Sequence, residues 1–95
     1  MYVQLVLWNL ADSLTTIDEL RRVLEEELEW PLGKVEGLRS STWLADELGE
    51  RWGAVLTWDS EDASRAPLPA RLGEVIGTPP VVVEGFELVA TIEEE

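Results

Sequence analysis

The sequence predicts an α+β domain whose elements run strand, helix, strand, strand, helix, strand. Four short segments are rich in β-branched and aromatic residues, and apolar residues between the first two recur every three or four positions, as in a helix that faces a core. This order is typical of a split β-α-β unit, the ferredoxin-like antiparallel sheet of four strands with two helices on one face. A length of 95 residues fits a single domain over residues 1–95.

Apolar pattern and capping predict the first strand and the first helix. Residues 2–10 are almost continuously apolar, which suits a strand covered on both faces better than an edge strand. Thr16 and Glu19 have the spacing of a capping box and start a helix that runs to about Glu29. Its apolar residues form one stripe that must cover a flat apolar surface: Leu20, Val23, Leu24 and Leu28.

The next two strands are expected to form a hairpin. They cover residues 38–45 and 51–58, and the polar segment 46–50 joins them. Alternation divides the second strand into two faces, one with Leu38, Ser40, Thr42 and Leu44 and the other with Arg39, Ser41, Trp43 and Ala45. One face of the third strand carries Trp52, Ala54, Leu56 and Trp58.

The second helix is predicted to be short and the last strand long. Asp59 and Ser60 can cap a helix that starts at Glu61, and two prolines, Pro67 and Pro69, break it. A second helical piece is expected over residues 70–76, and the last strand over residues 81–92, with a bulge at Gly85. One side of that strand carries Phe86, Leu88, Ala90 and Ile92.

A homodimer is expected because two helices cover only one face of such a sheet. A chain of this size buries only about two-thirds of its unfolded surface, so a single copy has modest stability. A second copy of the same sheet is the simplest cover for the other face.

Charge and composition exclude several classes of function. Twenty acidic residues against seven basic ones give a net charge of −13, which repels nucleic acids and anionic membrane surfaces. The chain has no cysteine, and therefore no disulfide, thiolate metal site or thiol nucleophile. Its start lacks a basic leader region, and no apolar run approaches the roughly 20 residues of a membrane span, so a cytoplasmic location is expected.

The hairpin region carries a resemblance to a known superfamily. Gly37 and Leu38 are followed by Ser41-Thr42-Trp43, and a second stretch, RWGAVLTWDSEDA, runs from Arg51 to Ala63. This pattern resembles the dimeric α/β-barrel superfamily, and within it the monooxygenase-like proteins related to antibiotic-biosynthesis monooxygenases. One glycine of that family pattern is Trp52 here. The resemblance implies a homodimer and a small apolar pocket for an aromatic or polyketide-like molecule.

The same resemblance implies a reaction without a cofactor, with Asn9 at the end of the first strand and a tryptophan, here Trp43, as catalytic residues. Three further residues are substrate-binding candidates from their own positions: Trp8 and Trp58 on predicted strands, and Arg39 on the strand face of Trp43. Each has a structural alternative: a turn for the asparagine, a rim salt bridge for the arginine, and core packing or dimer contact for the tryptophans. The sequence has no histidine, which excludes haem ligation by that residue.

Two functions from different classes remain open. The first is a cofactor-independent monooxygenase that acts on a small aromatic ligand. A carboxylate of raised pKa could be its acid or base, and the candidates near strands or strand ends are Asp46, Glu47, Glu84 and Glu87. The second is a non-catalytic ligand-binding or assembly domain on the same fold. A closed cavity lined by Trp43, with Asn9 or Arg39 pointing inward, would favour the enzyme.

Overall fold

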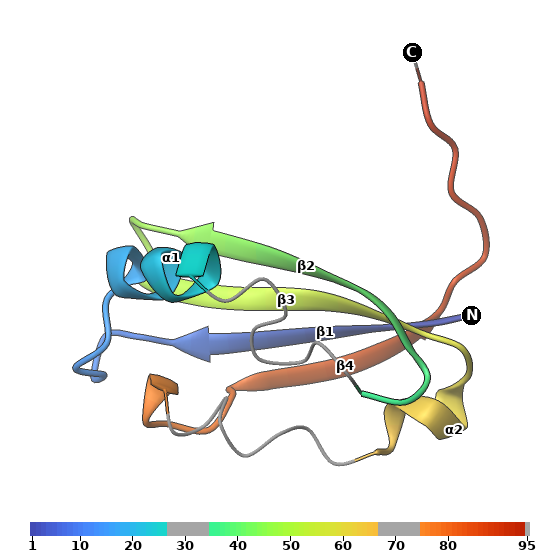
Figure 1. Ribbon diagram of the computed structural model, residues 1–95, viewed down its shortest axis with the longest axis horizontal. Coiled ribbons are helices and arrows are strands. Elements are labelled where there is room, and N and C mark those ends of the chain that lie inside the picture. Colours follow the sequence, from blue (N-terminus) through green and yellow to red (C-terminus); the bar gives the residue numbers. More distant parts are fainter. Residues whose placement is uncertain (27–34, 67–74, 95) are drawn as a thin grey trace.

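The computed structural model describes residues 1–26, 35–66 and 75–94. Its elements follow the expected order, shown in Figure 1: β1 (Tyr2–Asn9), α1 (Ile17–Glu26), β2 (Leu38–Asp46), β3 (Arg51–Trp58), α2 (Glu61–Ser64) and β4 (Val82–Glu87). The strands form one antiparallel sheet in the order β2-β3-β1-β4. The α+β class is therefore confirmed, and the apolar strand β1 lies inside the sheet, with β2 and β4 at its edges.

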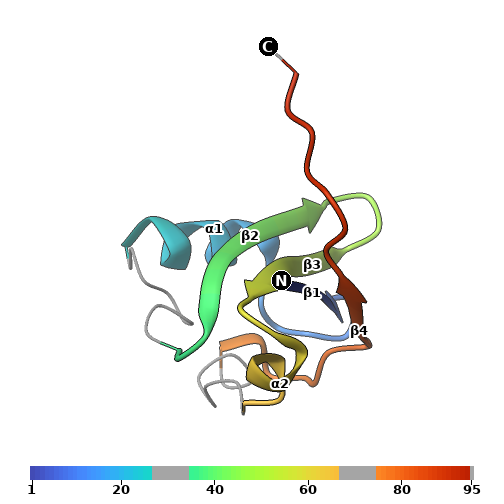
Figure 2. The same ribbon diagram turned by 90° about the vertical axis from the view of Figure 1, so that its right-hand side faces the viewer.

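The core lies on one face of this sheet. The register pairs Val6 with Ala54 and Trp8 with Trp52, so these four side chains point to the same side. Leu20 of α1 is buried in the same cluster and Ala63 of α2 packs against it, which places both helices on that face (Figure 2). The buried residues are Val6, Trp8, Leu10, Leu20, Trp52, Ala54, Leu56, Trp58 and Ile76.

Both helices begin where their capping residues predict. The backbone N–H of Glu19 donates to Thr16 Oγ1 over 3.2 Å, and the N–H of Ala63 donates to Ser60 Oγ over 3.1 Å. Helix α2 ends at Ser64, ahead of the prolines. The predicted end of the first helix lies outside the described residues. So does most of the second helical piece that was predicted over residues 70–76.

The predicted faces of β2 are wrong at its start because of an irregularity in the strand. The register shifts between Leu38 and Ser40, so Leu38 lies opposite Trp58 and packs against the core, whereas Ser40 lies opposite Thr57 on the other face. Alternation is regular from there on. A single inserted residue, Arg39, thus turns Leu38 inward.

The last strand is shorter than predicted and has no bulge. Its register with β1 is continuous, so the bulge expected at Gly85 is absent, and a Cβ at that position would instead overlap the ring of Tyr2. Strand β4 ends at Glu87 because the partner strand β1 begins at Tyr2, opposite it. Beyond that point only the Leu88 N–H, bonded to the Met1 carbonyl over 3.0 Å, continues the ladder.

The opposite face of the sheet is apolar and carries no helix in the described part of the chain. We call it the open face. The strand registers place on it seven large apolar side chains, which are half-buried or exposed: Val3, Leu5, Leu7, Leu44, Val55, Val82 and Phe86. One carboxylate, Glu84, lies on the same face opposite Leu5.

Two leucines that differ only in their surroundings test the position of the core. Leu20 is fully buried, whereas Leu14, in the loop before α1, is 99% exposed. We expect Leu20→Ala to lower the free energy of unfolding in urea by about 2 to 5 kcal/mol, because it leaves a cavity beneath α1. Leu14→Ala should change it by no more than about 0.5 kcal/mol. Equal losses in the two variants would contradict the core described above.

Candidate functional site

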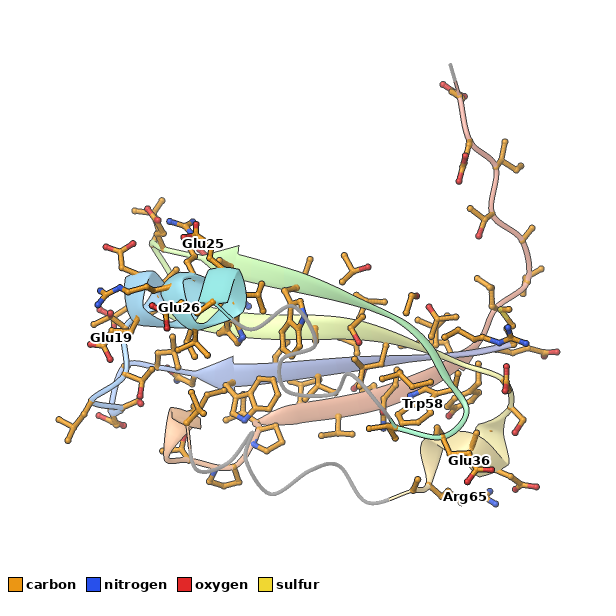
Figure 3. All side chains as sticks on the ribbon, in the orientation of Figure 1. Glu19, Glu25, Glu26, Glu36, Trp58 and Arg65 are labelled. Atoms are coloured by element: carbon orange, nitrogen blue, oxygen red, sulfur yellow. The ribbon has the colours of Figure 1, made fainter. Side chains whose placement is uncertain are left out.

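Trp8 and Trp58 are core residues in the structure. Both rings are at least 98% buried on the face that the helices cover. The indole Nε1–H of Trp58 donates to Gln4 Oε1 over 3.1 Å, which satisfies its polar atom. Figure 3 shows Trp58 near α2, at the other end of the sheet from α1 and its carboxylates Glu19, Glu25 and Glu26. These two rings therefore pack in the core, which was the structural alternative to substrate binding.

A second pair of indoles is buried without hydrogen bonds. Trp8 and Trp52 lie opposite each other on β1 and β3, and within the described structure neither Nε1–H has a partner. A buried donor left unpaired costs about 1 to 3 kcal/mol, so the apolar contacts of these rings must offset that cost.

Trp43 extends the aromatic core toward the edge of the sheet. Its ring is half-buried and stacks on Trp52, with 6.1 Å between the ring centroids and an angle of 26° between the planes. Such a pair adds about 0.5 to 1.5 kcal/mol beyond the area it buries. The ring of Trp43, one of the two proposed catalytic residues, thus lies on the core face and is still partly accessible.

Asn9 and Arg39 both make local contacts. Asn9 is exposed, and its Oδ1 accepts a hydrogen bond from the Ala11 N–H over 2.9 Å, so it starts a turn after β1. Arg39 forms an exposed ion pair with Asp59, the rim contact that was its alternative.

The structure does not bring these two residues together. Asn9 pairs with Arg51 at one end of the β1–β3 ladder, whereas Arg39 lies beside the other end, where Leu38 pairs with Trp58. Seven residue steps along a strand separate these ends, about 23 Å at about 3.3 Å per residue. A small aromatic molecule cannot contact both side chains at once.

Neither of two hollows lined by described residues has Trp8, Trp43 or Trp58 in its wall. The larger, of about 440 Å³, lies at the end of β1 beside the start of α1 and the β2–β3 hairpin. The smaller, of about 250 Å³, lies on the open face between Leu5, Leu7 and Leu44, with Trp52 and Gly53 in its wall.

Carboxylate and hydroxyl side chains make up much of the wall of the larger hollow. Three carboxylates line it: Asp18, Glu47 and Glu50. Its hydroxyls are engaged in the fold, because Ser13 Oγ donates to the Ile76 carbonyl over 2.7 Å and Thr15 Oγ1 to the Val75 carbonyl over 2.8 Å. These walls suit water and cations rather than an apolar or phenolate molecule. The described residues contain no group of three or more side chains placed to hold a metal ion.

Asp46 departs from the acid or base role considered for it. Its Oδ1 accepts from the Gly49 N–H over 3.0 Å, and its Oδ2 accepts from Arg51 Nη2 over 2.6 Å. The Gly49 amide first, and then the Arg51 guanidinium, hold the pKa of the Asp46 carboxyl below its usual value. The group therefore stays ionised and closes the hairpin, and sequence alone gave no sign of this contact.

Comparison with known proteins adds no family. No protein-family model matches the chain, and the search of curated proteins returns no significant match. Among the helices of the described ranges, none has the length and apolar character needed to cross a membrane.

The hairpin contact makes a prediction about pH. A lowered pKa in the folded chain means that the Asp46 contacts stabilise it fully above the unfolded pKa of about 4, and that this contribution is lost as the pH falls through the folded value. Carboxyl NMR titration should give a low midpoint for Asp46. Arg51→Ala should raise that midpoint only in part, because the Gly49 amide remains.

Arg65→Ala serves as the matched control for this titration. Arg65 pairs with Asp62 on α2 and has no contact with the hairpin, so its removal should leave the Asp46 midpoint unchanged. An Asp46 midpoint at the value of an unstructured peptide would contradict the contact.

Proposed function

We propose that this chain is a non-catalytic assembly domain that forms a homodimer through the open face. The observation that carries the proposal is the row of large apolar side chains on a sheet face that the helices leave uncovered. Phe86 is 53% exposed and Leu44 is 39% exposed on that face. A contiguous apolar surface of this kind marks an interaction site rather than a solvated face.

A second copy is the partner whose shape and chemistry match this face. Two such sheets can stack about 10 Å apart with their apolar side chains interdigitated, as in other sheet-on-sheet packing. A two-fold arrangement buries the same patch twice, so a few residues give a large apolar interface. Full burial of each Leu, Val or Phe contributes about 1.5 to 3 kcal/mol.

The sheet order supports a more specific assignment within this proposal. A β2-β3-β1-β4 antiparallel order with both helices on one face is compatible with a ferredoxin-like fold. Two such sheets closed against each other would make a dimeric α/β barrel. In that assembly the hollow of about 250 Å³ beside Leu44 would lie inside the interface.

Charge on the open face tests the dimer directly. We expect Leu44→Glu and Phe86→Glu to convert the dimer to a folded monomer in sedimentation equilibrium, because each places a carboxylate in the interface. Both positions are partly exposed already, so a single copy should tolerate the change. Leu48→Glu is the matched control, since Leu48 is fully exposed in the hairpin loop, away from the open face.

Ionic strength gives a further control for the same experiment. Each copy carries a net charge of −13, so repulsion opposes association and added salt should strengthen the dimer. A wild-type chain that stays monomeric at micromolar concentration and high salt would overturn the proposal.

One observation favours a small aromatic ligand as a second candidate function. The ring of Trp43 is half-buried on the core face and stacks on the buried ring of Trp52, so one aromatic ring stays partly accessible. A cofactor-independent monooxygenase of the kind that the resemblance implies could use such a surface. We place this candidate second because Trp43 lines neither of the two hollows described above, and the smaller one lies on the other face of the sheet.

Oxygen uptake separates the two candidates. With a hydroxyanthrone-type substrate we expect uptake equal to that of a protein-free control, because the assembly domain has no catalytic group. Uptake that the chain accelerates, and that Trp43→Ala abolishes while the circular dichroism spectrum stays native, would establish the oxygenase instead.

A further inference from the structure

The chain beyond β4 leaves the sheet as an extended arm. We call residues 88–94 the carboxyl-terminal arm. Its first residue still bonds to the Met1 carbonyl, and within the described structure no later residue of the arm makes a backbone hydrogen bond to another element. Figures 1 and 2 both show the arm running away from the sheet and both helices.

The sequence of the arm is that of a strand rather than of a solvated tail. Residues 88–92 read LVATI, without proline or glycine, and β-branched residues dominate them. Val89 is 91% exposed and Ile92 is 87% exposed. Five residues span about 17 Å, the length of an average strand. The arm thus has the composition and length of a strand, but beyond Leu88 it has no backbone partner among the described residues.

We infer that the arm pairs as an added strand with the edge of β2 in a second copy. The inference rests on the homodimer proposed above and names a further contact of that dimer. An extended segment added to an exposed sheet edge gains main-chain hydrogen bonds and covers the edge at the same time.

Geometry makes this pairing intermolecular. The arm leaves from β4, and the sheet order puts three strand spacings, about 14 Å, between β4 and β2 of the same chain. The seven residues of the arm reach at most about 24 Å, so crossing to its own β2 would leave about three residues to pair. The β2 edge of a second copy can receive the whole arm.

Charge selects β2 over the other free edge. The arm ends in the acidic residues Glu93 and Glu94, and β4 carries two further acids, Glu84 and Glu87, over its six residues. Strand β2 is longer, at nine residues, and has no acid before Asp46. Its one cation, Arg39, already pairs with Asp59, so β2 offers the arm a neutral edge. Pairing with β2 therefore avoids like-charge repulsion across the new ladder.

Disulfide trapping between copies tests the inference, because the chain has no cysteine of its own. Ala90→Cys would be mixed in turn with Ser41→Cys, Thr42→Cys and, for the competing edge, Glu84→Cys. A disulfide forms only where Cα atoms come within about 4.4 to 6.8 Å, and the two β2 positions cover both faces of the strand. We expect mixed disulfides with β2 and not with Glu84→Cys; dominance of the Glu84→Cys product, or no mixed product, would overturn the inference.

Proline substitutions in the arm supply an independent readout. Val89→Pro and Ala90→Pro remove neighbouring backbone donors, so one of them must disrupt the new ladder whichever register it adopts. We expect at least one to weaken dimerisation about tenfold or more. The unfolding of the monomer should not change, because in the described structure neither residue makes a backbone hydrogen bond to another element. Glu94→Pro is the control at the end of the arm and should have little effect.

The two proposals fail in different ways. Dissociation by Leu44→Glu together with indifference to both arm prolines would overturn the arm contact and leave the open-face dimer standing. Dissociation by the prolines with indifference to Leu44→Glu and Phe86→Glu would overturn the open-face interface and support the arm. A chain that is monomeric throughout would overturn both.

Discussion

The antiparallel pairing of β1 with β3 is the constraint on which the rest of the structure depends. Its register sets Trp8 opposite Trp52 and Tyr2 opposite Trp58, so the bulky aromatic side chains of two strands accumulate on the same face. Helices α1 and α2 cover that face in the described structure, together with Leu10 and Ile76 from outside the helices and strands. Both helices are used on one side, and the other side of the sheet keeps its aliphatic residues in contact with solvent.

This asymmetry connects the open face, the free edges and the arm. Among residues 1–26, 35–66 and 75–94 the sheet has one uncovered apolar face and two edges without a further strand, and such surface is poorly solvated by water. A strongly acidic exterior limits random association. A specific two-fold partner would satisfy face and edge together. The proposed assembly is therefore a consequence of how unevenly this short chain distributes its apolar residues over the sheet.

Local sequence patterns predicted most of the fold. The features that they did not predict depend on interactions between residues distant in sequence. Strand β3 and the start of α2 follow from alternation, prolines and capping at Ser60, all of which act within a few residues. The turn inward at Leu38 depends on one inserted residue, and the end of β4 depends on where β1 begins, so neither has a local signal. The reason for glycine at position 85 is the ring of Tyr2, which leaves no room for a Cβ there. Tyr2 is distant in sequence, so the local pattern indicated a bulge instead.

The candidate site divided along the same line. Asn9 as a turn residue and Arg39 as a rim ion pair matched their local alternatives, and the sequence could not show that the two lie at opposite ends of the sheet.

The stacked indoles of Trp43 and Trp52 have a spectroscopic consequence. Chromophores held 6.1 Å apart couple excitonically, so the far-ultraviolet circular dichroism of this chain should contain a tryptophan couplet that reports whether β2 is docked on β3.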